Sequence, residues 1–134
     1  MKTMLYDAPG FGSAWYESSN NCIYAYWENM LTQKHMRPSC EAQLEAVKKY
    51  GAKAVIIDTS DSKGTPMVDD QKWFGEYLFP NMQKAGIKAI ITVLPKDALA
   101  KLGAKTWNKT GNMFDIDFFE VNSRAEAENQ AKKY

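Results

Sequence analysis

The chain is poor in the residues that usually build metal and disulfide sites. It has two cysteines, Cys22 and Cys40, and one histidine, His35. Two cysteines are too few for a disulfide scaffold, and with a single histidine they do not match the spacing of a zinc site. We therefore expect no cofactor and no metal. Because a catalytic histidine needs an acidic or nucleophilic partner, and none is placed beside His35, we interpret this histidine as a solvated residue.

Long apolar runs and a charge bias are also missing. No stretch approaches the ~20 apolar residues of a membrane span, and Pro9, Gly10 and Gly12 interrupt the region where a signal peptide would need an apolar core. The net charge is only +1, which argues against a nucleic-acid partner. These absences predict a cytoplasmic protein with no membrane span.

What remains is a globular composition in a chain of one-domain length, with 134 residues of which 45% are hydrophobic. The glycines and proline near the start predict that residues 1–13 form a loose N-terminal arm. Residues 14–134 are expected to form a single folded domain.

Short apolar runs alternate with helical patterns along that domain. We expect strands at 14–17, 22–27, 53–59, 87–94 and 114–121, and helices at 38–50, 70–85, 96–102 and from Arg124, where Ser123 and Glu126 match a capping box. Gly103 is expected to close the third helix, and residues 104–114 to form a polar loop. The order β-β-α-β-α-β-α-β-α predicts a single-domain α/β fold, a mostly parallel mixed sheet with helices packed against it.

An acidic loop follows the 53–59 strand, which we expect to be the central strand of the sheet. Because it lies at the end of the sheet, this loop is a candidate regulatory or partner surface. Its residues are Asp58, Ser60, Asp61, Ser62, Asp69 and Asp70. Such carboxylates could bind a cation, but Asp69 or Asp70 is better explained as the N-cap of the next helix, with the others in solvated turns.

The domain resembles the STAS family, which includes bacterial anti-sigma-factor antagonists. The resemblance rests on the element order, the strand Val55-Ile-Ile-Asp58, the segments Lys84-Ala-Gly86 and Val93-Leu-Pro95, and the Ser-capped last helix. It is nearest to stand-alone STAS-like proteins, a group also compared with small lipid-binding domains. The resemblance implies a non-enzymatic regulatory or protein-interaction domain.

The family's phosphorylation switch does not carry over. Regulated members are phosphorylated on a serine where the loop after the central strand meets the next helix. This chain reads Val68-Asp-Asp-Gln71 there, and Asp70 lies nearest to the phosphorylated position. A carboxylate cannot accept phosphate from a serine kinase, so we expect no control of this kind.

Aromatic residues provide a second set of candidates, for an apolar ligand or an interface. They are Tyr24, Tyr26, Trp27, Trp73, Phe74 and Tyr77. The stripe that includes Trp73 and Tyr77 is expected to pack against the sheet, with Pro80 kinking its helix. One alternative function is binding of a small apolar or lipid-like ligand in an aromatic-lined pocket. Another is a hydrolase or transferase that uses the acidic loop.

The same aromatic residues predict association. Side chains alternate along the 22–27 strand, so Ile23 and Trp27 are expected on one face of the sheet and Tyr24 and Tyr26 on the other, and both faces are apolar. One sheet face cannot obviously cover the whole stripe of the 70–85 helix. We therefore expect a homodimer with two-fold symmetry, formed through the hairpin of the 14–17 and 22–27 strands, the 70–85 helix, or both. The alternative is that the arm 1–13 folds back over the hairpin within one chain.

Overall fold

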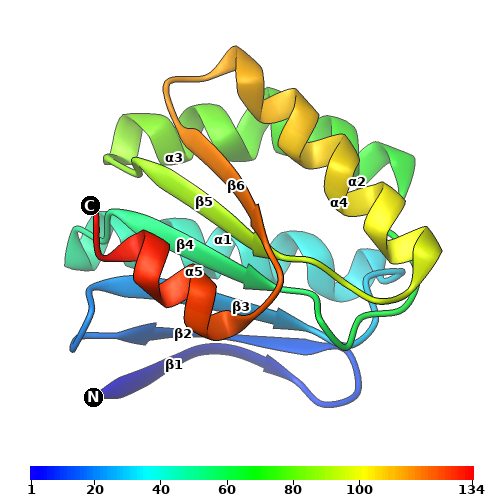
Figure 1. The fold of residues 1–134 in the computed structure, drawn as a ribbon, viewed down its shortest axis with the longest axis horizontal. Helices are drawn as coiled ribbons and strands as arrows, with labels where there is room; N and C mark the ends of the chain where they lie inside the picture. Colours follow the sequence, from blue (N-terminus) through cyan, green and yellow to red (C-terminus); the bar gives the residue numbers. More distant parts are fainter.

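The computed structural model describes residues 1–134, apart from the side chain of Asn112. It confirms the α/β fold, with one six-stranded mixed sheet (Figure 1). The strands follow the chain in the order β1 Lys2–Ala8, β2 Gly12–Glu17, β3 Cys22–Trp27, β4 Ala54–Asp58, β5 Ala89–Val93 and β6 Asp117–Val121. β1, β2 and β3 are antiparallel, whereas β3 to β6 are parallel, so the two halves of the sheet are built differently.

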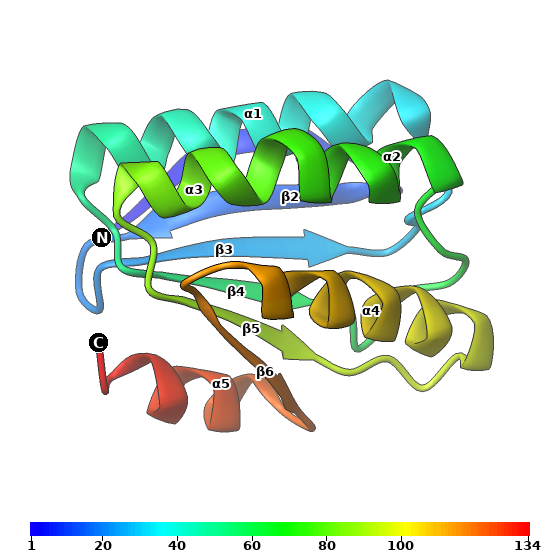
Figure 2. The ribbon, with the colours of Figure 1, turned by 90° about the horizontal axis from the view of Figure 1, so that it is seen from above.

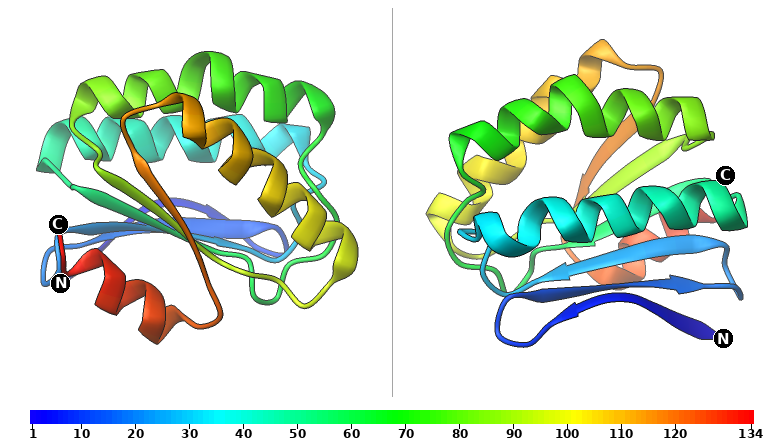
Figure 3. Two further views of the ribbon diagram at one scale, coloured as in Figure 1. Left: turned by 45° about the horizontal axis from the view of Figure 1, so that its top comes forward. Right: turned by 180° about the vertical axis from the view of Figure 1, so that it is seen from behind.

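Helices lie on both faces of the sheet, with α1 over β1–β3 (Figure 2). They are α1 Gln33–Tyr50, α2 Val68–Trp73, the π-helical turn η1 Phe74–Leu78, α3 Phe79–Ala85, α4 Ala98–Thr110, the 3-10 turn η2 Gly111–Met113 and α5 Arg124–Ala131. α1, α2–α3 and α4 lie on one face, and α5 lies on the other (Figures 2 and 3). Within the part of the chain that is described, no helix has the length and apolarity needed to cross a membrane.

The N-terminal arm was predicted wrongly. Lys2–Ala8 is the edge strand β1, and the Pro9-Gly10 signals belong to the turn that joins it to β2. Two side chains anchor the strand: Leu5 packs against the core, and the Tyr6 hydroxyl lies 2.6 Å from Nδ1 of His35. His35 is therefore half-buried and not simply solvated, with its ring centroid 4.8 Å from that of Phe11.

The first long helix begins earlier than expected. α1 starts at Gln33, so Pro38 lies inside the helix and not at its start. Pro38 cannot donate to the carbonyl of Lys34, but both residues are exposed and water can satisfy that carbonyl. The added turn places Met36 in the core, and its burial favours the longer helix.

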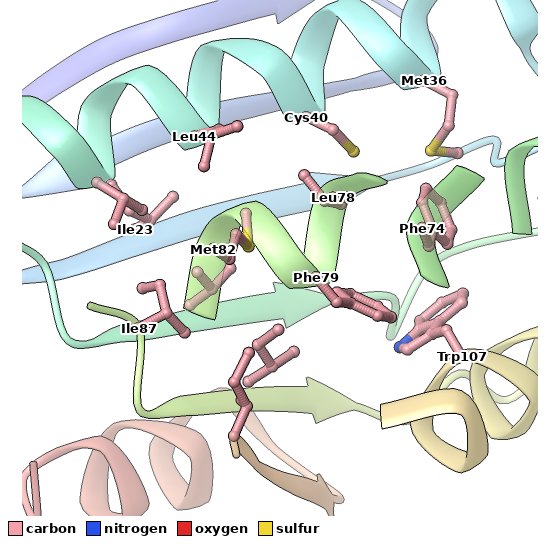
Figure 4. Close-up of a cluster of buried hydrophobic side chains, with 14 of the residues drawn as sticks. Ile23, Met36, Cys40, Leu44, Phe74, Leu78, Phe79, Met82, Ile87 and Trp107 are labelled. Carbon is pink, nitrogen blue, oxygen red and sulfur yellow. The ribbon is translucent and has the colours of Figure 1, made fainter. Parts of the chain in front are cut away.

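The 70–85 helix is interrupted, as Pro80 predicted, but the interruption also changes which side chains face inward. At η1 the Phe79 N–H bonds to the Phe74 carbonyl, five residues back. This wider turn directs Phe74, Leu78, Phe79 and Met82 into the core (Figure 4). The expectation that Trp73 packs fully against the sheet was wrong: Trp73 is half-buried, and Tyr77 is 37% exposed.

The predicted polar loop at 104–114 is largely helical. α4 continues through Gly103 to Thr110, because Trp107 is buried and its Nε1 donates to Oγ1 of Thr92 at 3.1 Å. Gly103 serves a different purpose from the predicted helix end. A Cβ at this position would lie 2.1 Å from Oγ1 of Thr65, so the glycine allows α4 to approach the loop after β4 closely.

Gly103→Ala should therefore destabilise the protein by about 1–3 kcal/mol, the usual cost of overpacking. In an open helix the same change would stabilise by up to ~1 kcal/mol, because alanine has the higher helix propensity. Denaturant melts followed by circular dichroism distinguish this loss of stability from the gain expected in an open helix. Lys105→Ala, on the exposed side of the same helix, is the control and should change little. A Gly103→Ala variant as stable as the wild type would contradict the close approach.

Candidate functional site

Asp58 ends β4 at the carboxyl-terminal edge of the parallel strands and is bound from two directions. One oxygen, Oδ1, accepts hydrogen bonds from the backbone N–H (3.0 Å) and the hydroxyl (2.6 Å) of Ser60. The other, Oδ2, accepts from Nε (3.0 Å) and Nη2 (2.7 Å) of Arg124 at the start of α5. Burial alone would raise the pKa of this carboxyl, but Ser60 and the Arg124 charge hold the pKa below its ordinary value of 3.8.

Neighbouring residues of the acidic loop are engaged in other contacts. Asp61 accepts a hydrogen bond from the Tyr26 hydroxyl at 3.0 Å. Ser62 is buried and donates to the Trp27 carbonyl, which pins the loop to β3. Among the described residues no three His, Cys, Asp or Glu side chains are grouped to hold a metal ion. Asp58, Ser60 and Asp61 thus lie at one edge of the sheet, but their hydrogen bonds stabilise the loop.

Asp69 and Asp70 belong to a different surface, and neither is the N-cap as predicted. Met67 is the N-cap of α2, and both aspartates lie in the first turn. Asp69 is exposed, whereas the Asp70 carboxylate is buried and accepts from Nε of Arg37 at 2.8 Å. This ion pair joins α2 to α1. Its existence could not be read from the sequence, because Arg37 is 33 residues away from Asp70.

The candidate aromatic residues do not form one pocket. Trp27 and Phe74 line the core on the α1 side of the sheet. Tyr24 lies on the opposite face, stacked on Trp15 with centroids 5.3 Å apart, and Tyr26 packs at the margin of the same cluster. This division follows the alternation of side chains along β3, which the sequence predicted. Trp73 is half-buried and packs against the edge of the first cluster, whereas Tyr77 belongs to neither cluster and is 37% exposed.

A small apolar cavity lies between the sheet, α1 and the α2–α3 segment. Its volume is about 40 Å³, and its lining includes Trp27, Met36, Cys40, Phe74 and Trp107. An engineered cavity that binds benzene is nearly fourfold larger, at roughly 150 Å³. A drug-sized ligand would therefore fit only if the surrounding side chains moved.

The outer side of the same helices carries an exposed aromatic group. The rings of Trp73 and Tyr77 stack with centroids 5.1 Å apart and planes 20° from parallel. The Arg37 guanidinium lies 5.4 Å from the Trp73 ring centroid, and the Tyr77 hydroxyl donates to Glu41 at 3.3 Å. We call these four residues, Arg37, Glu41, Trp73 and Tyr77, the α1–α2 surface. Sequence reasoning identified its two aromatic residues but missed Arg37 and Glu41.

Comparisons with known proteins returned nothing for this chain: no family model, no curated protein and no solved structure matched it. Functional inference therefore rests on the arrangement of its own residues.

Proposed function

We propose that this protein is a non-enzymatic, STAS-like regulatory or protein-interaction domain whose partner docks on the α1–α2 surface. The observation that carries the proposal is the stacked Trp73–Tyr77 pair beneath Arg37 on the outside of the fold. Tryptophan, tyrosine and arginine are the residues most enriched at the energetic centres of protein interfaces. Here they are adjacent, with Arg37 and Tyr77 exposed and Trp73 half-buried.

The buried Asp70 supports this role because it orders Arg37 before any partner arrives. Its carboxylate holds Nε, while Nη2 of Arg37 donates to the Asp69 carbonyl at 3.4 Å. An arginine held in this way loses less side-chain entropy on binding. Since Asp70, and not a serine, lies nearest to the family's phosphorylated position, we propose that the interaction is not switched by serine phosphorylation there.

A second copy of the chain is the first partner to consider. The hairpin residues Trp15, Tyr24 and Trp27 are buried within one chain, and β1 pairs with the free edge of β2. Because the hairpin is already covered within one chain, a dimer contact through the 70–85 helical segment is favoured over one through the hairpin. A two-fold contact through Trp73 and Tyr77 would place identical aromatic pairs against each other.

The two alternative functions have weaker support. A hydrolase or transferase would need a free carboxylate and a convergent partner, whereas Asp58 is bound to Arg124 and Ser60. An apolar ligand would have to enlarge a cavity of about 40 Å³. Both arrangements favour an interaction domain over an enzyme or a ligand carrier.

The proposal is tested by placing a photo-crosslinking amino acid at Tyr77, with Lys84, an exposed residue farther along the same helical segment, as the matched control position. We expect irradiation in cells to give one discrete adduct from position 77 and none from position 84. An adduct of twice the chain mass would identify a homodimer, and any other discrete mass a different protein. Equal labelling at both positions, or none at either, would reject the α1–α2 surface as an interface.

A further inference from the structure

The outward face of α4 concentrates positive charge. Lys101, Lys105 and Lys109 recur every four residues, so they lie along one side of the helix, and all three are exposed. No acidic residue occurs between positions 98 and 114. This surface contrasts with the nearly neutral chain as a whole, which has a net charge of +1.

Two acidic residues that contact α4 are occupied by hydrogen bonds to it. Asp97 is the N-cap, and its Oδ2 accepts from the Ala100 N–H at 2.9 Å. Glu120 on β6 accepts from the side chain of Asn108 at 3.3 Å. Among the described ion pairs none involves a lysine of α4. The three lysines therefore present their charge to the solvent.

Large aliphatic side chains are exposed beside these lysines. Leu99 and Leu102 on α4 are 55% and 63% exposed, and Val68 at the start of α2 is 83% exposed. The close contact of Gly103 with Thr65 brings α4 against the loop that leads into α2, and Figure 2 shows the two helices starting at the same end of the molecule. The buried side of α4, which includes Trp107, fixes the orientation of its outward face.

We propose that this face of α4, together with Val68, docks peripherally on an anionic membrane surface. Lysines attract acidic headgroups, and exposed aliphatic side chains beside them gain by entering the boundary between headgroups and acyl chains. Lysine also binds the phosphates of nucleic acids, but exposed leucines gain nothing there, and a protein interface centre is usually aromatic. The outward face of α4 instead combines lysine with leucine. This inference is independent of the α1–α2 surface.

Vesicle sedimentation with the full chain tests the proposal. Vesicles of phosphatidylcholine with phosphatidylserine should bind the protein at low salt, and pure phosphatidylcholine should bind it much less. The triple variant K101E/K105E/K109E should lose at least ~100-fold in partition coefficient, since each lysine near an anionic surface contributes about a factor of five or more. The control triple variant K84E/K88E/K132E alters exposed lysines elsewhere to the same net charge and should retain most of the binding.

A second pair of variants separates membranes from other polyanions. L99S/L102S should weaken vesicle binding by at least about tenfold, because the inserted apolar surface is lost. Wild-type protein that fails to bind anionic vesicles overturns the proposal, as does an equal loss in the control triple variant. If polyglutamate or duplex DNA binds as tightly as vesicles and L99S/L102S binds all of them unchanged, the surface recognises a polyanion and the membrane assignment is wrong. Circular dichroism melts verify that each variant is folded.

Discussion

Trp107→Ala should lower the free energy of unfolding by about 3–5 kcal/mol, the range for a large aromatic residue removed from a core. Trp107 is only 4% exposed and packs edge-on against Phe74 with centroids 6.3 Å apart. The change also removes the donor to the buried Thr92 hydroxyl, which would then lose a hydrogen-bond partner. The lost packing and the lost hydrogen bond both lower the stability of the folded protein.

Trp73→Ala is the matched control for this measurement. Trp73 is half-buried, and its described aromatic contacts are with Phe74 and the partly exposed Tyr77. We expect a smaller loss than for Trp107, because only part of the Trp73 ring is buried on folding; its pair with Tyr77 adds about 0.5–1.5 kcal/mol to that burial. Chemical denaturation followed by far-ultraviolet circular dichroism avoids the change in tryptophan fluorescence. A larger loss for Trp73 than for Trp107 would mean that the π-turn does not orient the helix as described.

Asp58→Asn should cost about 2–3 kcal/mol at pH 7, because it removes the charge that Arg124 binds with two N–H groups. The dependence on pH has a definite sign. Since the folded state lowers the pKa of Asp58 below 3.8, the carboxylate stabilises the fold fully above that pH. This contribution is lost as the pH falls through the lower pKa of the folded protein.

The difference in stability between wild type and Asp58→Asn should therefore be constant near neutral pH and shrink in acid below about pH 4. Urea melts at a series of pH values measure it. Asp115→Asn, at an exposed position, is the control and should change stability by less than ~0.5 kcal/mol throughout. If the difference for Asp58→Asn grew in acid, the carboxyl would have a raised pKa in the folded protein, and the ion pair with Arg124 would not be its main contact.

Local patterns in the sequence were sufficient where a single element decides the outcome. The alternating apolar residues of 22–27 predicted that Ile23 and Tyr24 face opposite sides of the sheet, because side chains alternate along any strand. The N-cap at Ser123 was also correct: its hydroxyl accepts from the Glu126 N–H at 3.1 Å. The second bond of the predicted capping box differs, because the Glu126 carboxylate accepts from the N–H of Asn122, one residue before the N-cap, at 3.0 Å. Strands separated by helices predicted the parallel half of the sheet.

Contacts between distant segments decided the rest. Pro9 and Gly10 indicated an irregular segment, but the neighbouring β2 edge turned Lys2–Ala8 into a strand. Gly103 looked like a helix end because glycine weakens helices, and only the nearby Thr65 reveals why the helix tolerates it.

The candidate site depends on the same distinction. The sequence by itself determined the α/β class, the alternating faces of β3 and the position of Asp58 at the end of a strand. The tertiary structure decided the partners of the charged residues, joining Asp58 to Arg124 and Asp70 to Arg37 across 66 and 33 positions of the chain. It also left Tyr77 exposed and Trp73 only half-buried, because the wide turn at η1 changes the helical period that a sequence pattern assumes. Backbone preferences act between near neighbours, whereas ion pairs and packing depend on which segments the fold brings together.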